Sequence, residues 1–262
     1  MKKTKKLILF VLFLPLSLLI RLIMIFTEIR FIPINERIGH GVGNIDVYLA
    51  EKRFFKEKSI DIFYPDRPGK GNQQVLKMLS RVIYVNNLAY WVVWANWNTP
   101  LDIHYDPLSS DKDMFGLLKD TPCSVSFTEE EEIIGKNLLW NLDIPEGEKY
   151  VCFHARDKSY LNETQPGIDW SYHNHRDFDI DIYIQEIKEL VNRGYYCVRM
   201  GRIVEKPFGW KDSHVIDYAI SQYRSDFADM YLISKCSIYL GTSSGLDRVA
   251  RLFRKEIICK EK

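Results

Sequence analysis

The chain has 262 residues, of which 46% are hydrophobic and 27% are charged; this composition excludes collagen-like, disordered and coiled-coil proteins. Lys and Arg number 36 against 35 Asp and Glu, which gives a formal net charge of +1. General binding of nucleic acid, which needs a basic face, is therefore not expected, although a local basic pocket for a phosphate is compatible with this charge.

The first segment of the chain is a hydrophobic run that follows a basic start. Several lysines precede an apolar run from Leu7 to Phe26, which only Arg21 interrupts. As a helix this run would span about 30 Å, the thickness of a hydrocarbon core, and no small-residue cleavage site follows it. We predict that residues 1–28 anchor the protein to a membrane, either as a spanning helix or as a shallow helix or hairpin bent at Pro15. A buried core helix is the alternative.

The next elements resemble the opening of a βα unit. A short strand is expected at 29–34, and Arg37-Ile-Gly-His-Gly-Val-Gly43 reads as a glycine-rich turn before a helix. A second strand is expected at 59–64. Tryptophans recur every three residues in the stretch 88–107, which is more typical of a packed helical face than of a sugar platform. His40 lies in the glycine-rich turn, where it could deprotonate an acceptor hydroxyl or simply close the turn.

A helix from Thr128 to about Trp140, closed by Pro145, leads to an expected domain boundary, so we predict domains at 29–147 and 148–262. Strands and helices then alternate at short intervals, which predicts a doubly wound parallel sheet. The expected strands are 150–154, 195–200, 214–218, 237–240 and 256–259, and the expected helices are 179–193, 226–235 and 245–253.

The five cysteines give no metal or disulfide pattern. They lie at positions 123, 152, 197, 236 and 259, most of them in apolar runs and none in a CxxC pair. Buried reduced thiols in a reducing compartment are therefore expected.

Three polar motifs follow strands of the second half. They are His154-Ala-Arg156-Asp157, Arg199-Met-Gly201-Arg202 and Gly241-Thr-Ser-Ser-Gly245. Ligands of parallel sheets bind beyond the carboxyl ends of the strands. Arginines grip phosphate through two N–H groups, and a glycine-rich turn before a helix offers backbone N–H groups to an anion. Together the motifs predict a diphosphate site.

Two other sites are open from the residues alone. Gly241-Thr-Ser243-Ser-Gly245 also fits the G-x-S-x-G nucleophile elbow of α/β hydrolases, but no His follows Ser243, so the usual order of the triad is not completed. His173 and His175 lie near Asp177 and could hold a metal, but no third ligand stands at a characteristic spacing. No metal is predicted.

The residues also resemble a known family. The matching segments are Arg37-Ile-Gly-His40, His154-Ala-Arg156-Asp157 with Tyr160, Gly194 to Gly201, Ile216-Asp217-Tyr218, Asp229 to Cys236 and Gly241 to Gly245. They are similar to bacterial glycosyltransferases of surface-polysaccharide gene clusters, most of all between 150 and 250. The His-x-Arg segment also resembles the motif with which GT-B fucosyltransferases hold the donor diphosphate.

The resemblance implies a GT-B fold of two Rossmann-like domains, an acceptor domain followed by a nucleotide-sugar domain, with no cofactor or metal. GT-B donor domains usually continue past the last strand expected here, so a truncated second domain is one expectation. His40 and Arg156 are the implied catalytic residues, and Gly39, His40, Gly41 and Gly43 the implied acceptor-binding residues. The implied donor-binding residues are His154, Arg156, Asp157, Arg199, Gly201, Asp229, Gly241, Thr242, Ser243, Ser244 and Gly245.

These observations predict a glycosyltransferase that moves a sugar from a nucleotide sugar to a lipid-linked or surface-polysaccharide acceptor. Its expected location is the cytoplasmic face of the bacterial inner membrane. The membrane surface is an expected partner, and nucleic acid is not. The alternatives are a non-catalytic relative that binds nucleotide sugar or acts as a scaffold and, as a third hypothesis, a hydrolase that uses Ser243.

Overall fold

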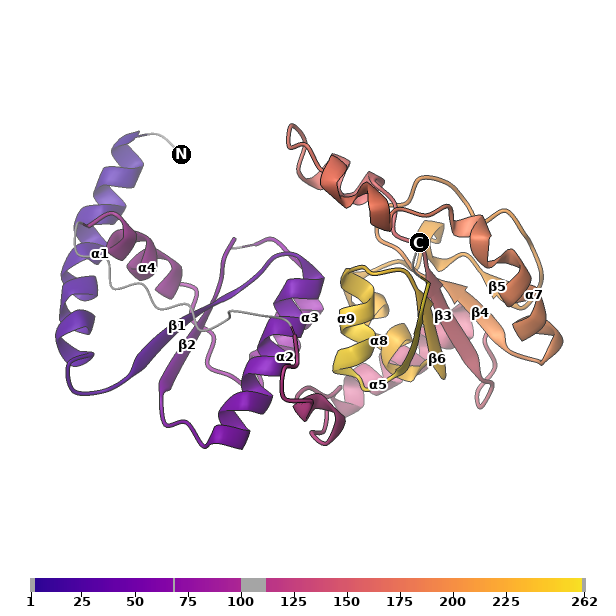
Figure 1. Cartoon of the computed structure of the whole chain (residues 1–262), viewed down its shortest axis with the longest axis horizontal. Helices are drawn as coiled ribbons and strands as arrows, with labels where there is room; N and C mark the ends of the chain where they lie inside the picture. Colours follow the sequence, from indigo (N-terminus) through magenta and orange to yellow (C-terminus); the bar gives the residue numbers. More distant parts are fainter. Residues whose placement is uncertain (1–2, 68, 100–111, 261–262) are drawn as a thin grey trace. The chain divides into compact units, whose positions relative to one another are not determined.

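The computed structural model describes residues 3–67, 69–99 and 112–260 (Figure 1). The first two residues of the expected anchor and residues 100–107 of the tryptophan-rich stretch therefore lie outside the described residues. The chain divides into two compact units, Met1–Val125 and Ser126–Lys262. Both are α/β with parallel strands, as the sequence predicts.

The division lies before helix α5 (Glu129–Asn141), whereas the sequence analysis placed a domain boundary after residue 147. A capping box at Thr128 starts this helix. The helix then packs on α8 (Asp226–Lys235), where the Tyr231 hydroxyl lies 3.2 Å from a Glu132 carboxylate oxygen. A Cβ atom at Gly135 would lie 2.0 Å from the Tyr231 ring, so only glycine permits this close packing. Contacts distant in sequence thus assign α5 to the second unit.

The first unit contains a parallel pair of strands, β1 (Ile29–Ile34) and β2 (Ile60–Pro65), with Ile29 opposite Ile60. A bridge between Phe63 and Val85 extends the pairing. Helices α2 (Ile38–Phe55) and α3 (Gln73–Leu79) lie to one side of the strands, and α1 (Lys3–Ile23) and α4 (Ala89–Trp97) to the other (Figure 1). A short 3-10 helix, η1, covers Leu117–Lys119.

The segment expected to be a glycine-rich turn is helical. Helix α2 begins at Ile38, so only Asn35 to Arg37 connect it to β1. A Cβ atom at Gly41 would lie 2.6 Å from the Asn35 carbonyl oxygen. The glycine therefore serves the close approach of the helix to the preceding turn and not a change of chain direction.

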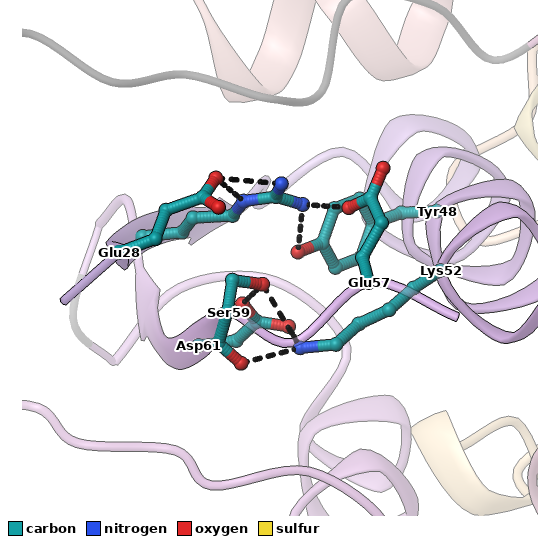
Figure 2. Close-up of polar contacts among 7 residues, drawn as sticks. Glu28, Tyr48, Lys52, Glu57, Ser59 and Asp61 are labelled. Atoms are coloured by element: carbon teal, nitrogen blue, oxygen red, sulfur yellow. Dashed lines mark hydrogen bonds and ion pairs between the residues drawn. The ribbon is translucent and has the colours of Figure 1, made fainter. Parts of the chain in front are cut away.

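A buried arginine joins the elements of the first unit. Arg30 of β1 is 7% exposed and donates to the Tyr48 hydroxyl at 3.0 Å and to the carboxylates of Glu28 and Glu57 (Figure 2). Burial raises the pKa of Tyr48 to about 12. Lys52 makes a neighbouring group of contacts, donating to the Ser59 carbonyl at 2.8 Å and to the Asp61 carboxylate (Figure 2). These contacts hold α2 against β1 and β2.

Helix α1 is long and apolar enough to cross a membrane, and only 6% of its apolar window is buried. The alternative of a buried core helix is therefore not supported. One face of the helix nevertheless packs on α4. Phe10 meets the Trp94 ring edge-on at 6.3 Å, Ser17 is 3% exposed, and Arg21 donates to the Asn96 side chain at 2.8 Å.

The second unit is a five-stranded parallel sheet with the order β5-β4-β3-β6-β7. Helix α7 lies on one face, and α5, α8 and α9 lie on the other (Figure 1). The strands are β3 (Tyr150–His154), β4 (Tyr196–Arg199), β5 (Val215–Ile216), β6 (Ile238–Gly241) and β7 (Glu256–Cys259), and the remaining helices are α6 (Ser159–Thr164), α7 (Ile184–Asn192) and α9 (Gly245–Leu252).

Short 3-10 helices complete the second unit at Ser171–Arg176, Ile180–Tyr183 and Tyr218–Ile220. The helix expected at 179–193 therefore starts as a 3-10 turn and becomes α-helical at Ile184. The doubly wound parallel sheet is confirmed.

The core of this sheet explains the apolar strand sequences. Val151, Phe153 and Ile187 are fully buried, and Phe153 packs edge-on against Phe208 at 5.0 Å. None of the five cysteines is in a disulfide. Cys152, Cys197 and Cys236 are buried as expected, Cys123 is half-buried, and Cys259 is exposed beside Gly241 of the neighbouring strand.

Candidate functional site

The three polar motifs of the second unit meet at one edge of the sheet. They follow β4, β3 and β6, which are adjacent strands, and all three strands run in parallel. The chain order proceeds outward from β3 to β4 and β5, then returns to the other side of β3 with β6 and β7. The point of reversal lies between β3 and β6, where ligands bind in open α/β sheets. The motifs that begin at His154 and Gly241 flank this point.

The loop between β6 and α9 is held by contacts with the end of β3. The Thr242 hydroxyl is fully buried and accepts a hydrogen bond from the Arg156 backbone N–H at 2.8 Å. Ser244 is the N-cap of α9, and its N–H donates to the Asp247 carboxylate at 3.2 Å. Ser243 between them is half-buried. The first turn of α9 therefore opens at the switch point, with the positive end of its dipole directed there.

His154 lies against this loop as a neutral imidazole. Its Nδ1 atom is 3.4 Å from the Ser244 hydroxyl. The pKa of His154 is lowered to about 4, chiefly by burial and also by the nearby Arg199 and Arg156 guanidinium groups, against the raising effect of Asp157. At neutral pH this side chain is a hydrogen-bonding group without charge.

Arg156 is already paired. Its guanidinium donates to the Asp177 carboxylate and, at 3.2 Å, to the His173 carbonyl. Its side chain is 11% exposed. Asp157 next to it accepts from the backbone N–H groups of Ser159 at 2.8 Å and Glu205 at 3.0 Å. Asp157 thus fixes the loop, while an anion that approaches Arg156 must compete with Asp177.

Arg199 is more deeply buried than Arg156. Its side chain is 3% exposed and donates from Nη1 to both Asp217 carboxylate oxygens, at 3.1 and 3.2 Å. Asp217 in turn accepts from the Phe208 backbone N–H at 2.8 Å. Among the described residues, no hydrogen-bond partner reaches the buried Nε atom of Arg199. Gly201 beyond it has a φ of 153° and a Cβ there would lie 2.5 Å from Val204, so this turn requires glycine.

Asp229 is buried in the first turn of α8, beside the loop that follows β5. It is 5% exposed, accepts from the Tyr218 hydroxyl at 2.8 Å and pairs with Arg224 at 3.0 Å. Burial raises the pKa of Asp229. These contacts support the fold, and the donor role that the resemblance implies for Asp229 stays a prediction.

The residues implied for the acceptor lie in the first turns of α2. His40 is exposed, Gly39 is half-buried, and Gly41 and Gly43 are buried. A cavity of about 420 Å³ lies elsewhere in this unit, beside the carboxyl ends of β1 and β2, where Asn35 and Asp66 line it. No motif of the sequence indicates this cavity, because its walls come from elements that are far apart in the chain.

The comparisons with known proteins concern the fold. No protein-family model matches the sequence, and no curated protein is significantly similar to it. Among solved structures, a glycosyl transferase family 9 protein from Veillonella parvula superimposes with a TM-score of 0.50 at 9% identity, over 88% of this chain and 80% of that chain. The chain has the GT-B fold.

Two further solved structures are less similar to this GT-B chain. The heptosyltransferase WaaC of E. coli, solved with ADP-2-deoxy-2-fluoro heptose, gives a TM-score of 0.45 at 10% identity over 88% of both chains. TibC of enterotoxigenic E. coli, an iron-containing dodecameric glycosyltransferase, gives 0.44 at 12% identity over 89% of this chain and 58% of its own. The fucosyltransferase-like interpretation of His154-Ala-Arg156 stays a prediction.

The alternative sites do not gain support from this GT-B structure. The hydroxyl in contact with His154 belongs to Ser244, the helix cap, and not to Ser243 of the elbow motif. His173 Nδ1 contacts Arg176, and the Asp177 carboxylate is paired with Arg156. Within the described ranges, no group of three or more His, Cys, Asp or Glu side chains is arranged to hold a metal.

The neutral His154 gives the protein a pH-dependent stability. The folded pKa, about 4, lies below the ordinary value of 6.5, so the unfolded chain binds more protons between these values. We expect the free energy of unfolding to fall by up to about 3 kcal/mol as the pH drops from 6.5 to 4. Urea unfolding across this range should show a smaller loss in His154→Gln. Identical pH profiles of the two proteins would contradict the expectation.

Proposed function

We propose that the protein is a glycosyltransferase that moves a sugar from a nucleotide sugar to a lipid-linked or surface-polysaccharide acceptor. The observation that carries the proposal is the meeting of three polar motifs at the switch point of the second sheet, on β4, β3 and β6. This is the position at which open α/β sheets bind phosphate-bearing ligands. The GT-B fold supports the same assignment.

In this proposal the donor diphosphate lies at the first turn of α9. When the bond between the sugar and the diphosphate breaks, negative charge grows on the leaving oxygen, and fixed N–H dipoles and cations lower its energy. In the proposal the α9 N-terminus and the Ser243 hydroxyl supply such dipoles, and Arg156, whose backbone N–H bonds the Thr242 hydroxyl of the same loop, supplies a cation. Neutral His154 donates or accepts a hydrogen bond without adding charge.

The acceptor side of the proposal concerns the first unit. His40, which is exposed on the first turn of α2, remains the proposed base. Helix α1 exposes a long row of apolar side chains behind the lysines at the start of the chain. We propose that it attaches the protein to the cytoplasmic face of the inner membrane.

A non-catalytic relative that binds nucleotide sugar is the second candidate, and one observation favours it. Both arginines of the predicted diphosphate site are paired with carboxylates, Arg156 with Asp177 and Arg199 with Asp217. If protein carboxylates occupy the arginines that would otherwise bind phosphate, the fold is kept and the ligand binds weakly. This candidate predicts weak binding and no turnover.

Titration calorimetry on the full chain in a non-ionic detergent tests the assignment. ADP, UDP, GDP, CDP and CMP are titrated separately, with and without EDTA. We expect one nucleoside diphosphate to bind in both conditions and to identify the base, after which hydrolysis of the matching nucleotide sugar measures turnover. If the folded protein binds none of these nucleotides, the transferase assignment is wrong. Binding without turnover in the presence of lipid-linked acceptors would favour the second candidate.

A further inference from the structure

One cavity of the first unit is built partly from the hydrophobic helix α1. The cavity of about 420 Å³ lies between α1, α4 and the carboxyl ends of β1 and β2. This volume falls in the range of small-molecule sites, about 300 to 1,000 Å³. Ile20 and Met24 of α1 and Val93 and Trp97 of α4 form its apolar wall. Asn35 and Asp66, which follow β1 and β2, are polar residues of its lining.

A cation, Arg21, lines the same cavity and makes no ion pair within the described part of the chain. The Arg21 guanidinium donates to the Asn96 side-chain oxygen at 2.8 Å from Nε and also reaches the Thr99 hydroxyl. These are neutral acceptors. No carboxylate among the described residues pairs with Arg21, whereas the other half-buried or buried arginines described above each hold one. A positive charge held in place by neutral groups is suited to an external anion.

The same helix exposes its remaining faces as apolar surface. Leu12, Leu19 and Leu22 are 65%, 53% and 57% exposed, and lysines precede the run. Apolar surface of this extent with a basic start is typical of a helix that lies in the lipid interface. An amphiphile that is already in the membrane would therefore reach the cavity from the side of α1.

Packing on α4 also limits how α1 can meet the membrane. Contacts with α4 extend from Phe10, against Trp94, to Arg21, against Asn96. If α1 lies in the membrane surface while packed on α4, the cavity lies at the level of the lipid headgroups, where tryptophans and arginines are favoured. Trp91 and Trp94 on α4 are themselves partly exposed.

We propose that this cavity binds a phosphate-bearing amphiphile with a long aliphatic chain, its phosphate on Arg21 and its chain along Ile20, Met24 and Trp97. The identity of the amphiphile rests on the proposed function: in a glycosyltransferase of this kind it is the lipid part of the acceptor. The same chemistry is found in membrane phospholipids, so the two sources must be separated by experiment.

Photo-crosslinking of the full chain tests the proposal. The protein is reconstituted in phosphatidylcholine vesicles with a small fraction of an alkyl phosphate that carries a diazirine in its chain. We expect labelled peptides to map to Ile20, Met24 and Trp97, and labelling to be suppressed by unlabelled dodecyl phosphate but not by dodecanol. Isoprenyl diphosphate and phosphatidylglycerol, added as separate competitors, distinguish the lipid-linked acceptor from bulk phospholipid by which one suppresses labelling at lower concentration.

Matched variants give the result its control. We expect Arg21→Gln to reduce phosphate-dependent labelling about tenfold, the loss of one charged hydrogen-bonding partner, and Arg53→Gln on the exposed face of α2 to leave it unchanged. Met24→Trp should fill the cavity and reduce labelling, whereas Ile25→Trp, at a neighbouring position that is 72% exposed, should not. This second pair keeps the test valid if Arg21→Gln is poorly folded.

Labelling spread over Leu12, Leu19 and Leu22 with no dependence on the phosphate would overturn the proposal, because it would describe only the lipid around the helix. The assay contains no nucleotide. Nucleotide titration of the same preparations reports on the second unit, so failure of the lipid site and failure of the transferase assignment are observed separately.

Discussion

Replacing Arg156 with alanine is expected to weaken nucleoside diphosphate binding by roughly 10- to 100-fold. Hydrogen bonds to charged groups contribute about 1.5 to 3 kcal/mol, and 1.4 kcal/mol is a factor of ten. Arg156 follows β3 at the switch point, and its backbone N–H holds the Thr242 hydroxyl, which the substitution leaves in place. Calorimetry with the nucleotide that binds the unmodified protein measures the change.

Asp177→Asn is the matched variant and should have the opposite effect. Its carboxylate pairs with the Arg156 guanidinium, so an anion must displace it or share the cation. Asparagine keeps the shape and a carbonyl oxygen while removing the charge, and we expect nucleotide affinity to rise several-fold. Arg193→Ala, on the exposed end of α7, removes the same charge as Arg156→Ala and therefore controls for the change in net charge of that variant. If neither Arg156→Ala nor Asp177→Asn changes the affinity, the donor does not bind at this arginine.

Arg199→Ala is expected to destabilise the second unit by about 3 kcal/mol. Its side chain is 3% exposed and bonds both oxygens of Asp217, which is 20% exposed. Removing one member of a buried ion pair leaves the other charge without compensation, at a cost of about 3 to 5 kcal/mol. The partial exposure of Asp217 puts the expected value at the lower end. Urea unfolding, followed by fluorescence at neutral pH, measures it.

Variants at this ion pair distinguish two roles of Arg199, stabilisation of the second unit and direct contact with the donor. Asp217→Asn should destabilise at least as much as Arg199→Ala, because it leaves the guanidinium, which is 3% exposed, without its carboxylate, although the amide oxygen still accepts one hydrogen bond. Arg199→Lys should restore only part of the loss, since lysine does not match the fork of the guanidinium. A fully stable Arg199→Ala protein that no longer binds nucleotide would show instead that this arginine contacts the donor directly.

The architecture of the second unit follows from local sequence, and most of its site chemistry does not. Apolar runs such as 150–153 and the spacing of helices between them predict the parallel sheet and the three edge motifs. Side-chain pairing is different, because it depends on residues brought together by the fold. His154 meets Ser244 across 90 positions of the chain, and Arg156 meets Asp177 across 21. The sequence motifs thus locate the binding edge of the sheet, but they do not indicate which carboxylates form ion pairs with its arginines.

The first unit shows the same limit in its glycines and its cavity. Three glycines in seven residues indicate a turn by local propensity, yet the segment is helical, and Gly41 is needed there for the close approach to the Asn35 carbonyl. Likewise, the sequence predicts that α5 ends the first domain, whereas the packing of Tyr231 on Gly135 assigns this helix to the second unit. Both are tertiary contacts that override a local preference.

The exposed thiol at the end of β7 offers a way to watch the site work. Cys259 lies beside Gly241, and the next residue, Lys260, donates its N–H to the Gly241 carbonyl at 2.8 Å. Cys152, Cys197 and Cys236 are buried, so an environment-sensitive maleimide dye should react first at Cys259, with half-buried Cys123 replaced by serine. The dye would then report, in real time and without a radioactive sugar, the arrival and departure of ligands at the loop before α9.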